Sequence, residues 1–272
     1  MSTKAKVSPE ERGDFTLEIT GDEVAAINDF ISKNPFAILQ IPRVREILTA
    51  MRIQRLKPED IRSLDGEISA GVKNVVKYNI EGVTGMWSLN RPSILINPLV
   101  CSQYFNRHAG SLEVLSIGPR TEAEIFALVA AGFNPKRIRG MDIISYSPYI
   151  DLGDMHDMPY EDDSFDVIFL GWVLAYSTDN KLAVSEVMRV AKPNAFIAIG
   201  CEYNPKTNEE ISEQLEAILE SPTGSDVTRF ETTEQILNLF EGGVDTILYR
   251  DDVHPTHRDD TGAAIVIFQL KG

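Results

Sequence analysis

The sequence predicts an α/β fold: one mostly parallel β-sheet, doubly wound with helices, an antiparallel hairpin at one edge and a mainly helical N-terminal cap. Two observations predict it. From about residue 106 onward, short apolar runs alternate with helical segments, the pattern of a parallel sheet with crossover helices. Before that point, apolar residues recur at helical spacing. The chain therefore divides into a flexible N-terminus (1–14), a helical cap that carries a substrate segment (15–105) and a sheet domain (106–272).

The cap begins with a capping-box signature, because Thr20 is followed three residues later by Glu23. Apolar residues at helical spacing then predict three helices, over residues 24–31, 44–51 and 61–75. The second helix also carries basic side chains, which indicate either a solvated face or an anionic partner: Arg43, Arg45, Arg52, Arg55 and Lys57.

Apolar runs mark the strands of the sheet domain. The predicted parallel strands are 112–117, 138–141, 150–152, 167–170 and 196–199. Two further β-rich runs, 245–249 and 263–270, are joined by a loop too short and too rich in Asp, Pro and His for a helical crossover. We therefore predict that they form the antiparallel hairpin. Thr121 and Glu124 form a second capping box that opens the first crossover helix, and Gly132 suits its left-handed end.

Composition excludes several classes of function. The chain has 272 residues and a formal net charge of -15, which argues against a nucleic acid as partner because phosphate binding needs clustered Lys and Arg. No apolar run approaches the ~20 residues of a membrane-spanning helix, and the polar start has no signal region. The two cysteines are too few for a disulfide framework, so we expect a cytoplasmic protein. No His or carboxylate pair has convincing metal spacing, so we predict no metal.

Polar residues stand at the ends of the predicted strands, where an open α/β sheet binds its ligands. Asp142 closes the second strand and lies 24 positions after Gly118, because 142 minus 118 is 24. A carboxylate at about that offset accepts hydrogen bonds from ribose hydroxyls in dinucleotide-binding folds.

Two segments carry a resemblance to a known family. The stretch GDMHDMPYEDDSFD, residues 153–166, resembles the GDAxxLPFxDxSFD segment of class I S-adenosylmethionine-dependent methyltransferases, particularly the type 11 group. The stretch NKLAVSEVMRVAKPNA, residues 180–195, is similar to the family's helix and turn ending in RVLKPGG. The resemblance covers roughly residues 106–200. It implies a Rossmann-like methyltransferase sheet that binds S-adenosylmethionine, methylates an oxygen or nitrogen of a small-molecule acceptor by in-line displacement, and releases S-adenosylhomocysteine.

The family's pattern assigns the adenosine end of the cofactor to two neighbouring strand ends. Asp142 would bind the ribose hydroxyls, with Ile143 beside it, and Asp154 would accept from the adenine amino group. The backbone of Met155 would meet the edge of the adenine ring, and His156 would neighbour the adenine pocket or lie on the surface.

The methionine end is assigned to the loops after the first and fourth strands. The family's first loop reads GxGxG, and this chain keeps only Gly118, which would let the main chain approach the cofactor. Pro119 lacks a donor N–H, and we hypothesise that Arg120 compensates by pairing with the cofactor's carboxylate. The alternative is an ion pair of Arg120 with a neighbouring glutamate, Glu122 or Glu124. Gly171 and Trp172 would face the sulfonium and the acceptor.

Methyl transfer from a sulfonium depends mainly on alignment and exclusion of water, and a hydroxyl acceptor would also need a base. The candidate bases are His254 and His257, in the loop between the last two strands, and Glu202 and Tyr203, just past the fifth strand. For the two histidines a solvated loop is the alternative. The segment SLNRPSILINPL, residues 88–99, is the part of the cap predicted to line the acceptor pocket.

Two other functions stay open at this stage. The missing glycines favour a noncatalytic protein that kept the fold, and the acidic second strand is shared with nicotinamide-dependent oxidoreductases, although the full GxGxxG is absent. The sequence names neither the acceptor nor the oligomeric state, and a homodimer is one of the states open to it.

Overall fold

The structure is a computed structural model that describes residues 19–64, 91–119, 121–203, 205–207, 210, 228–254, 256 and 261–272. Arg120 and His257 lie outside the described residues, and so does most of the predicted helix 61–75. The chain divides into two compact units, Met1–Ile38 and Leu39–Gly272. In the described part, no helix has the length and apolar character needed to cross a membrane.

The first unit contains helix α1, Gly21–Lys33. Its predicted capping box is confirmed, because the Thr20 hydroxyl accepts from the Glu23 amide while the Glu23 carboxylate accepts from the Thr20 amide. No residue of α1 is buried, and Val24 and Ile27 are about half exposed. The 3-10 turn η2, Pro35–Gln40, follows it.

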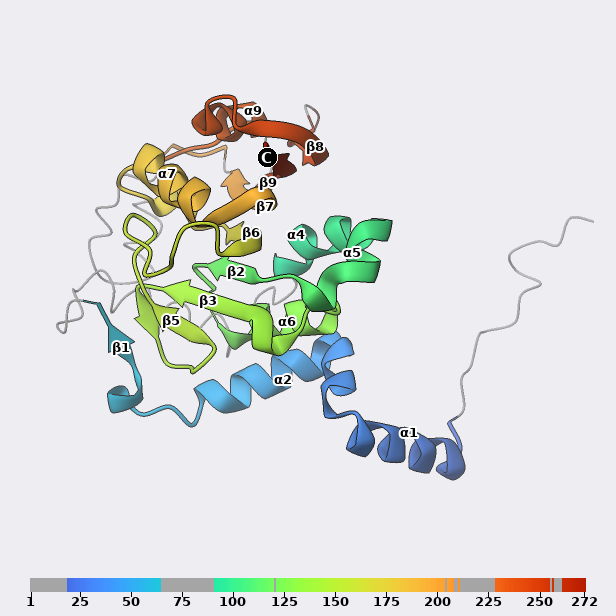
Figure 1. The fold of residues 1–272 in the computed structure, drawn as a ribbon. Coiled ribbons are helices and arrows are strands. Elements are labelled where there is room, and N and C mark those ends of the chain that lie inside the picture. Colours follow the sequence, from blue (N-terminus) through green and yellow to red (C-terminus); the bar gives the residue numbers. More distant parts are fainter. Residues whose placement is uncertain are drawn as a thin grey trace, which may run out of the picture. The chain divides into compact units, whose positions relative to one another are not determined.

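The second unit is built on a seven-stranded sheet of order β5-β3-β2-β6-β7-β9-β8 (Figure 1). The strands are β2 (Val114–Ile117), β3 (Ile138–Asp142), β5 (Ile150–Leu152), β6 (Phe165–Gly171), β7 (Ala191–Tyr203), β8 (Val244–Asp251) and β9 (Gly262–Leu270). The first five are mutually parallel, and β9 is antiparallel to both β7 and β8. The predicted parallel strands and the edge hairpin are therefore confirmed, and the structure adds that β9 is the inner strand of that hairpin.

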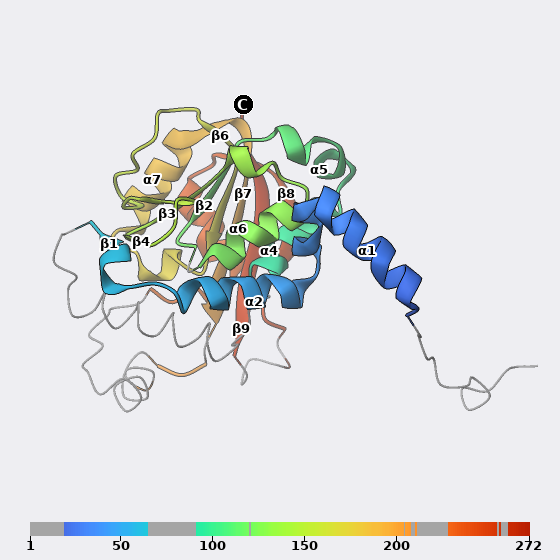
Figure 2. The same ribbon diagram turned by 90° about the horizontal axis from the view of Figure 1, so that it is seen from below.

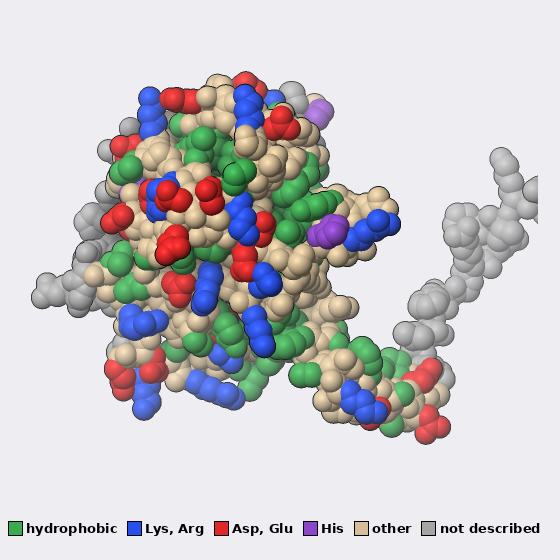
Figure 3. All heavy atoms as spheres, in the orientation of Figure 1, with side chains coloured by type: hydrophobic (Ala, Val, Ile, Leu, Met, Phe, Trp, Pro, Cys, Tyr) green, Lys and Arg blue, Asp and Glu red, His purple; other side chains and the backbone are tan. Residues whose placement is uncertain are grey.

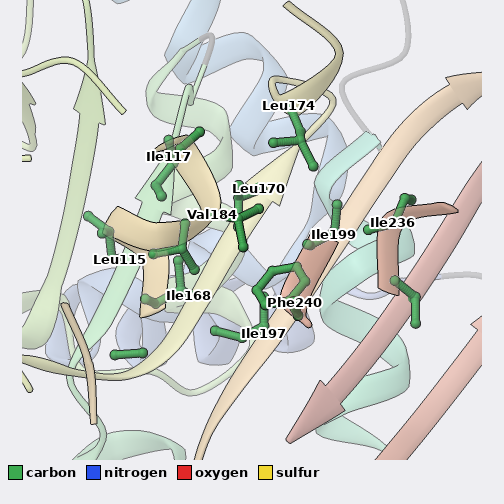
Figure 4. Close-up of a cluster of buried hydrophobic side chains, with 14 of the residues drawn as sticks. Leu115, Ile117, Ile168, Leu170, Leu174, Val184, Ile197, Ile199, Ile236 and Phe240 are labelled. Carbon is green, nitrogen blue, oxygen red and sulfur yellow. The ribbon is translucent and has the colours of Figure 1, made fainter. Parts of the chain in front are cut away.

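Helices pack against both faces of the sheet, because its central strands are apolar on both sides. One buried cluster joins the sheet to α4 (Arg91–Val100), α5 (Gln103–His108) and α6 (Glu122–Ala130). The other joins it to α7 (Asn180–Val190), α9 (Thr233–Leu237) and the turn η7 (Asn238–Phe240). Figure 4 shows this second cluster, in which Val184 of α7 and Phe240 lie against Ile168, Leu170 and Ile197 of the sheet.

Helix α2, Pro42–Ile53, forms as predicted and lies along α6 (Figure 2). Its buried residues are Thr49 and Ile53. Of the apolar repeat, Val44 and Leu48 are partly buried, whereas Ile47 and Met51 are about half exposed, so the repeat marks the buried side only in part. The basic residues of this helix are largely engaged: Arg43 pairs with Glu46, Arg45 donates to the Leu39 carbonyl, and Arg52 pairs with Glu122. Acidic and basic side chains are intermixed on the face seen in Figure 3.

The prediction that the third helix begins at residue 61 is wrong. Arg62–Ser63 form strand β1, which pairs antiparallel with β4, Ile144–Ser145, just beyond the end of β3. The Leu64 amide also donates to the Ile143 carbonyl at 3.3 Å. The backbone groups that a helix would have used internally are therefore satisfied by a segment distant in sequence, which a local pattern does not reveal.

Candidate functional site

The strand order reverses at β2, which has β3 on one side and β6 on the other. In open α/β sheets, ligands bind beyond the carboxyl ends of the strands at such a switch point. Asp142 is the last residue of β3 and is paired in register with Leu152 of β5, so Asp154 lies two residues beyond that pair. The backbone thus places both carboxylates at one edge of the sheet, on neighbouring strand ends.

The Asp142 side chain is largely buried and has few donors around it. The Ile144 amide donates to Oδ1 at 3.2 Å. Burial raises the pKa of this carboxyl to about 6, and the backbone donors of Ile144 and Ile143 offset the effect only in part. Ile143 itself is 39% exposed. A partly buried carboxylate short of donors fits a ribose, whose two adjacent hydroxyls would supply them.

The Asp154 side chain is about half exposed and is held by its own neighbour. The His156 amide donates to Oδ1 at 2.9 Å, and Nδ1 of His156 lies 2.6 Å from the same oxygen. Among the described residues, Oδ2 has no hydrogen-bond partner, and the side chain as a whole is 47% exposed. Met155 is partly buried against the cluster on the α7 face. This arrangement fits an amino group as the ligand of Asp154, since a carboxylate only accepts.

Gly118 occupies a position that no other residue fits well. Its φ is +67°, and a Cβ built on it would lie 2.6 Å from Cγ2 of Val173, in the loop after β6. Val173 therefore occupies the space that a side chain at position 118 would need. The glycine thus allows the loops after β2 and β6 to come into close contact. Pro119 is buried, and a Cβ on Gly140 would lie 3.0 Å from its ring.

Glu122 stands where the family's loop has its third glycine. It is buried and paired with Arg52 of α2, and its carboxylate also accepts from the Ser147 hydroxyl. The Tyr146 hydroxyl accepts from the Glu122 amide at 3.1 Å. One of the two partners considered for Arg120 is thus engaged by Arg52.

The residues after β6 pack tightly. Trp172 has a φ of +60°, which is strained for a bulky residue, and its amide donates to the Gly200 carbonyl at 2.7 Å. Its side chain is buried, and a Cβ on Gly200 would meet the indole ring at 3.4 Å. Trp172 therefore belongs to the core as well as to the predicted site, whereas the neighbouring Tyr176 is exposed.

A shallow cleft opens beside β2 and β6. Its lining is apolar except for one serine and one carboxylate: Leu95, Ile96, Ser116, Glu124, Leu128, Phe169 and Gly171. Leu95 and Ile96 of this lining come from the segment 88–99. The sequence analysis assigned Glu124 to a capping box and did not include it among the site residues. In the structure, the Thr121 hydroxyl accepts from the Ala123 amide, and the Glu124 carboxylate lies near Gly171.

The candidate bases lie at the same edge of the sheet but are not part of that cleft. Glu202 is exposed and Tyr203 is buried, both at the end of β7 and paired with the start of β9. His254 is exposed, with Nδ1 2.7 Å from the Thr256 hydroxyl. Within the described ranges, no group of three His, Cys, Asp or Glu side chains could hold a metal ion.

Comparison with known proteins identifies the domain. A model of the methyltransferase domain family matches residues 118–199. Malonyl-[acyl-carrier protein] O-methyltransferase of Halorhodospira halophila is 29% identical over 90 residues, which are 33% of this chain and 30% of that protein. The chain therefore matches less than a third of this relative's length.

Solved structures share the fold at low sequence identity. The [4+2]-cyclase SpnF is 16% identical, with a TM-score of 0.50 over 73% of this chain and 93% of its own. A S-adenosylmethionine-dependent methyltransferase from Methanosarcina mazei is 17% identical, with a TM-score of 0.44 over 62% of this chain and 96% of its own. Such identities establish the fold alone. The family match, together with the two motifs in the sequence, shows that the sheet domain contains a methyltransferase domain over residues 118–199.

Proposed function

We propose that this protein transfers the methyl group of S-adenosylmethionine to an oxygen or nitrogen atom of a small-molecule acceptor and releases S-adenosylhomocysteine. The observation that carries the proposal is the pair of carboxylates on neighbouring strand ends, Asp142 with its shortage of donors and Asp154 with its half-exposed side chain. When bound, the cofactor supplies an electrophilic methyl group on a sulfonium.

The protein's own part is to bind, orient and exclude water. Asp142 would accept from the ribose hydroxyls and Asp154 from the adenine amino group, which fixes the nucleoside. The Glu124 carboxylate near Gly171 would attract the positively charged end of the cofactor. The apolar lining from α4, Leu95 and Ile96, would keep water from the reacting atoms. Alignment and desolvation are the main requirements of an in-line displacement.

A small acceptor fits the charge of the chain. A net charge of -15 repels polyanions. The curated relative's name specifies an acyl-carrier-protein substrate, which a match over a third of this chain does not transfer. A hydroxyl acceptor would use one of the exposed side chains at this edge, Glu202 or His254, as its base.

Titration calorimetry tests the proposal. Binding of S-adenosylmethionine and S-adenosylhomocysteine, with no binding of NADH, would support it. Binding of NADH alone would instead indicate an oxidoreductase.

A noncatalytic methyltransferase-fold protein is the second candidate, and a specific observation favours it: Glu122, a buried and ion-paired residue, replaces a glycine of the cofactor loop. If calorimetry detects no binding of S-adenosylmethionine, S-adenosylhomocysteine or NADH, the result would support this candidate. We also place the protein in the cytoplasm on its composition, and sedimentation would decide between a monomer and a homodimer.

A further inference from the structure

A chain of hydrogen bonds runs inward from Asp154. Nδ1 of His156 lies 2.6 Å from Oδ1 of Asp154, and Nε2 lies 2.8 Å from the Ser177 hydroxyl. The Asp179 amide donates to the same hydroxyl at 3.2 Å and lies 3.4 Å from Nε2. Three side chains and one backbone amide therefore form one connected network.

The partners in this network determine which atoms carry protons. A carboxylate only accepts, so Nδ1 of His156 must donate to Asp154. In a neutral imidazole, Nε2 is then an acceptor, and the Ser177 hydroxyl donates to it while accepting from the Asp179 amide. Each member thus has a defined role, and rotation of the Asp154 carboxylate would break the first bond of the series.

The network connects two loops that the sheet itself keeps apart. Asp154 follows β5 and Ser177 follows β6, and both β3 and β2 lie between these strands. Three strand spacings amount to ~14 Å, so the loops themselves bridge the gap. The inner end is shielded, with Ser177 5% exposed and the His156 side chain 16% exposed, whereas the Asp154 side chain is 47% exposed. A mostly shielded support therefore ends in a half-exposed carboxylate whose Oδ1 it holds.

We propose that His156 and Ser177 are positioning residues that hold Oδ2 of Asp154 toward the 6-amino group of adenine and thereby make the site selective for adenine. This inference rests on the proposed function. An amino group donates to a fixed carboxylate, whereas a base with a carbonyl at that position presents an acceptor and is repelled. A carboxylate that could rotate would discriminate less between the two bases, because it could turn away from the carbonyl oxygen that repels it.

The test compares two ligands that differ only in the base: S-adenosylhomocysteine and its analogue with hypoxanthine in place of adenine. Calorimetry should show that the parent prefers adenine by at least about tenfold, the effect of about one hydrogen bond to a charged group. His156→Phe, which removes both ring nitrogens, should reduce that preference to about threefold or less. His156→Asn retains a donor near the position of Nδ1 and should keep most of it.

Matched variants separate positioning from folding. Ser177→Ala should loosen the network and lower the preference by a smaller factor than His156→Phe, and it should change the ¹⁵N chemical shifts of His156. Ser185→Ala removes an exposed hydroxyl of α7 that, among the described residues, bonds only to the Leu182 carbonyl. It should change neither the preference for adenine nor the ¹⁵N chemical shifts of His156.

Three results would overturn the inference. One is a parent that binds both ligands equally. Another is a His156→Phe variant that binds both more weakly by the same factor, which would mean a merely structural role. The third is an Asn variant that loses the preference as completely as the Phe variant. A parent that binds neither ligand would instead refute the proposed function, and the inference with it.

Discussion

The two carboxylates at the sheet edge have contrasting surroundings. Asp142 is largely buried with few donors, and burial raises its pKa to about 6. Asp154 is about half exposed, and one of its oxygens is fixed by two hydrogen bonds from His156. Asp142 would therefore be stabilised most by new hydrogen-bond donors from a ligand. Asp154 would bind a ligand best when its carboxylate is held in one orientation.

From this difference we expect that the two carboxylates do not contribute equally to binding. A buried acceptor with few partners carries an energetic cost that a ligand can reduce. A preorganised, exposed acceptor adds less free energy but more selectivity, since water competes for it.

The largest effect is expected from removing the buried carboxylate. Asp142→Ala should weaken binding of S-adenosylhomocysteine by about 100-fold or more, because two hydrogen bonds to a charged acceptor contribute ~1.5–3 kcal/mol each. Calorimetry measures the affinity, and circular dichroism should show a folded protein. Asp151→Asn is the control, since Asp151 lies on the adjacent strand and bonds to the Tyr160 hydroxyl. Parental affinity in the Ala variant would disprove the placement of the ribose.

The raised pKa of Asp142 predicts a pH dependence of stability. An unfolded aspartate titrates near ~3.9, so between that value and about 6 the native state binds more protons and stability falls as the pH rises. Asp142→Asn removes this titration and should be more stable than the parent above pH 6, by on the order of 2 kcal/mol. Urea unfolding from pH 4 to 7 measures the difference, and a constant difference across that range would contradict the assignment.

The exposed carboxylate should matter less. Asp154→Asn should weaken binding of S-adenosylhomocysteine by about tenfold, because one hydrogen bond loses its charge. The same change should leave the affinity for the hypoxanthine analogue unchanged or raise it, since the amide can donate to a carbonyl. An effect as large as that of Asp142→Ala would remove the contrast between the two sites.

The smallest effect is expected at the apolar neighbour of the buried carboxylate. Ile143→Ala removes part of a side chain that is 39% exposed and should weaken cofactor binding by about fivefold through lost apolar contact. Calorimetry at several temperatures should show a less negative heat-capacity change on binding. Ile247→Ala, at a similarly exposed position on β8, is the matched control and should bind as the parent does.

Local signals predicted a large part of this molecule. The alternation of apolar runs and helices gave the strands of the parallel sheet, and the capping box at Thr20 and the left-handed Gly132 were read from single motifs. Asn194 stands where the family's RVLKPGG motif has a glycine, and it has a φ of +64°. Asparagine tolerates that conformation better than most residues.

Contacts between distant segments were not predictable in the same way. The apolar repeat of α2 includes Ile47 and Met51, but the buried residues of this helix are Thr49 and Ile53. Residues 62–64 were predicted to be helical, but they pair with residues beyond β3. Glu124 was interpreted as a cap and instead lines the cleft.

The sequence by itself determined the class of fold, the family and the two acidic strand ends, because each depends on residues close together in the chain. Only the tertiary structure decided how those carboxylates differ. Burial of Asp142 and support of Asp154 through Ser177 come from loops and strands far apart in sequence, and the environment of a side chain is set by everything that packs around it.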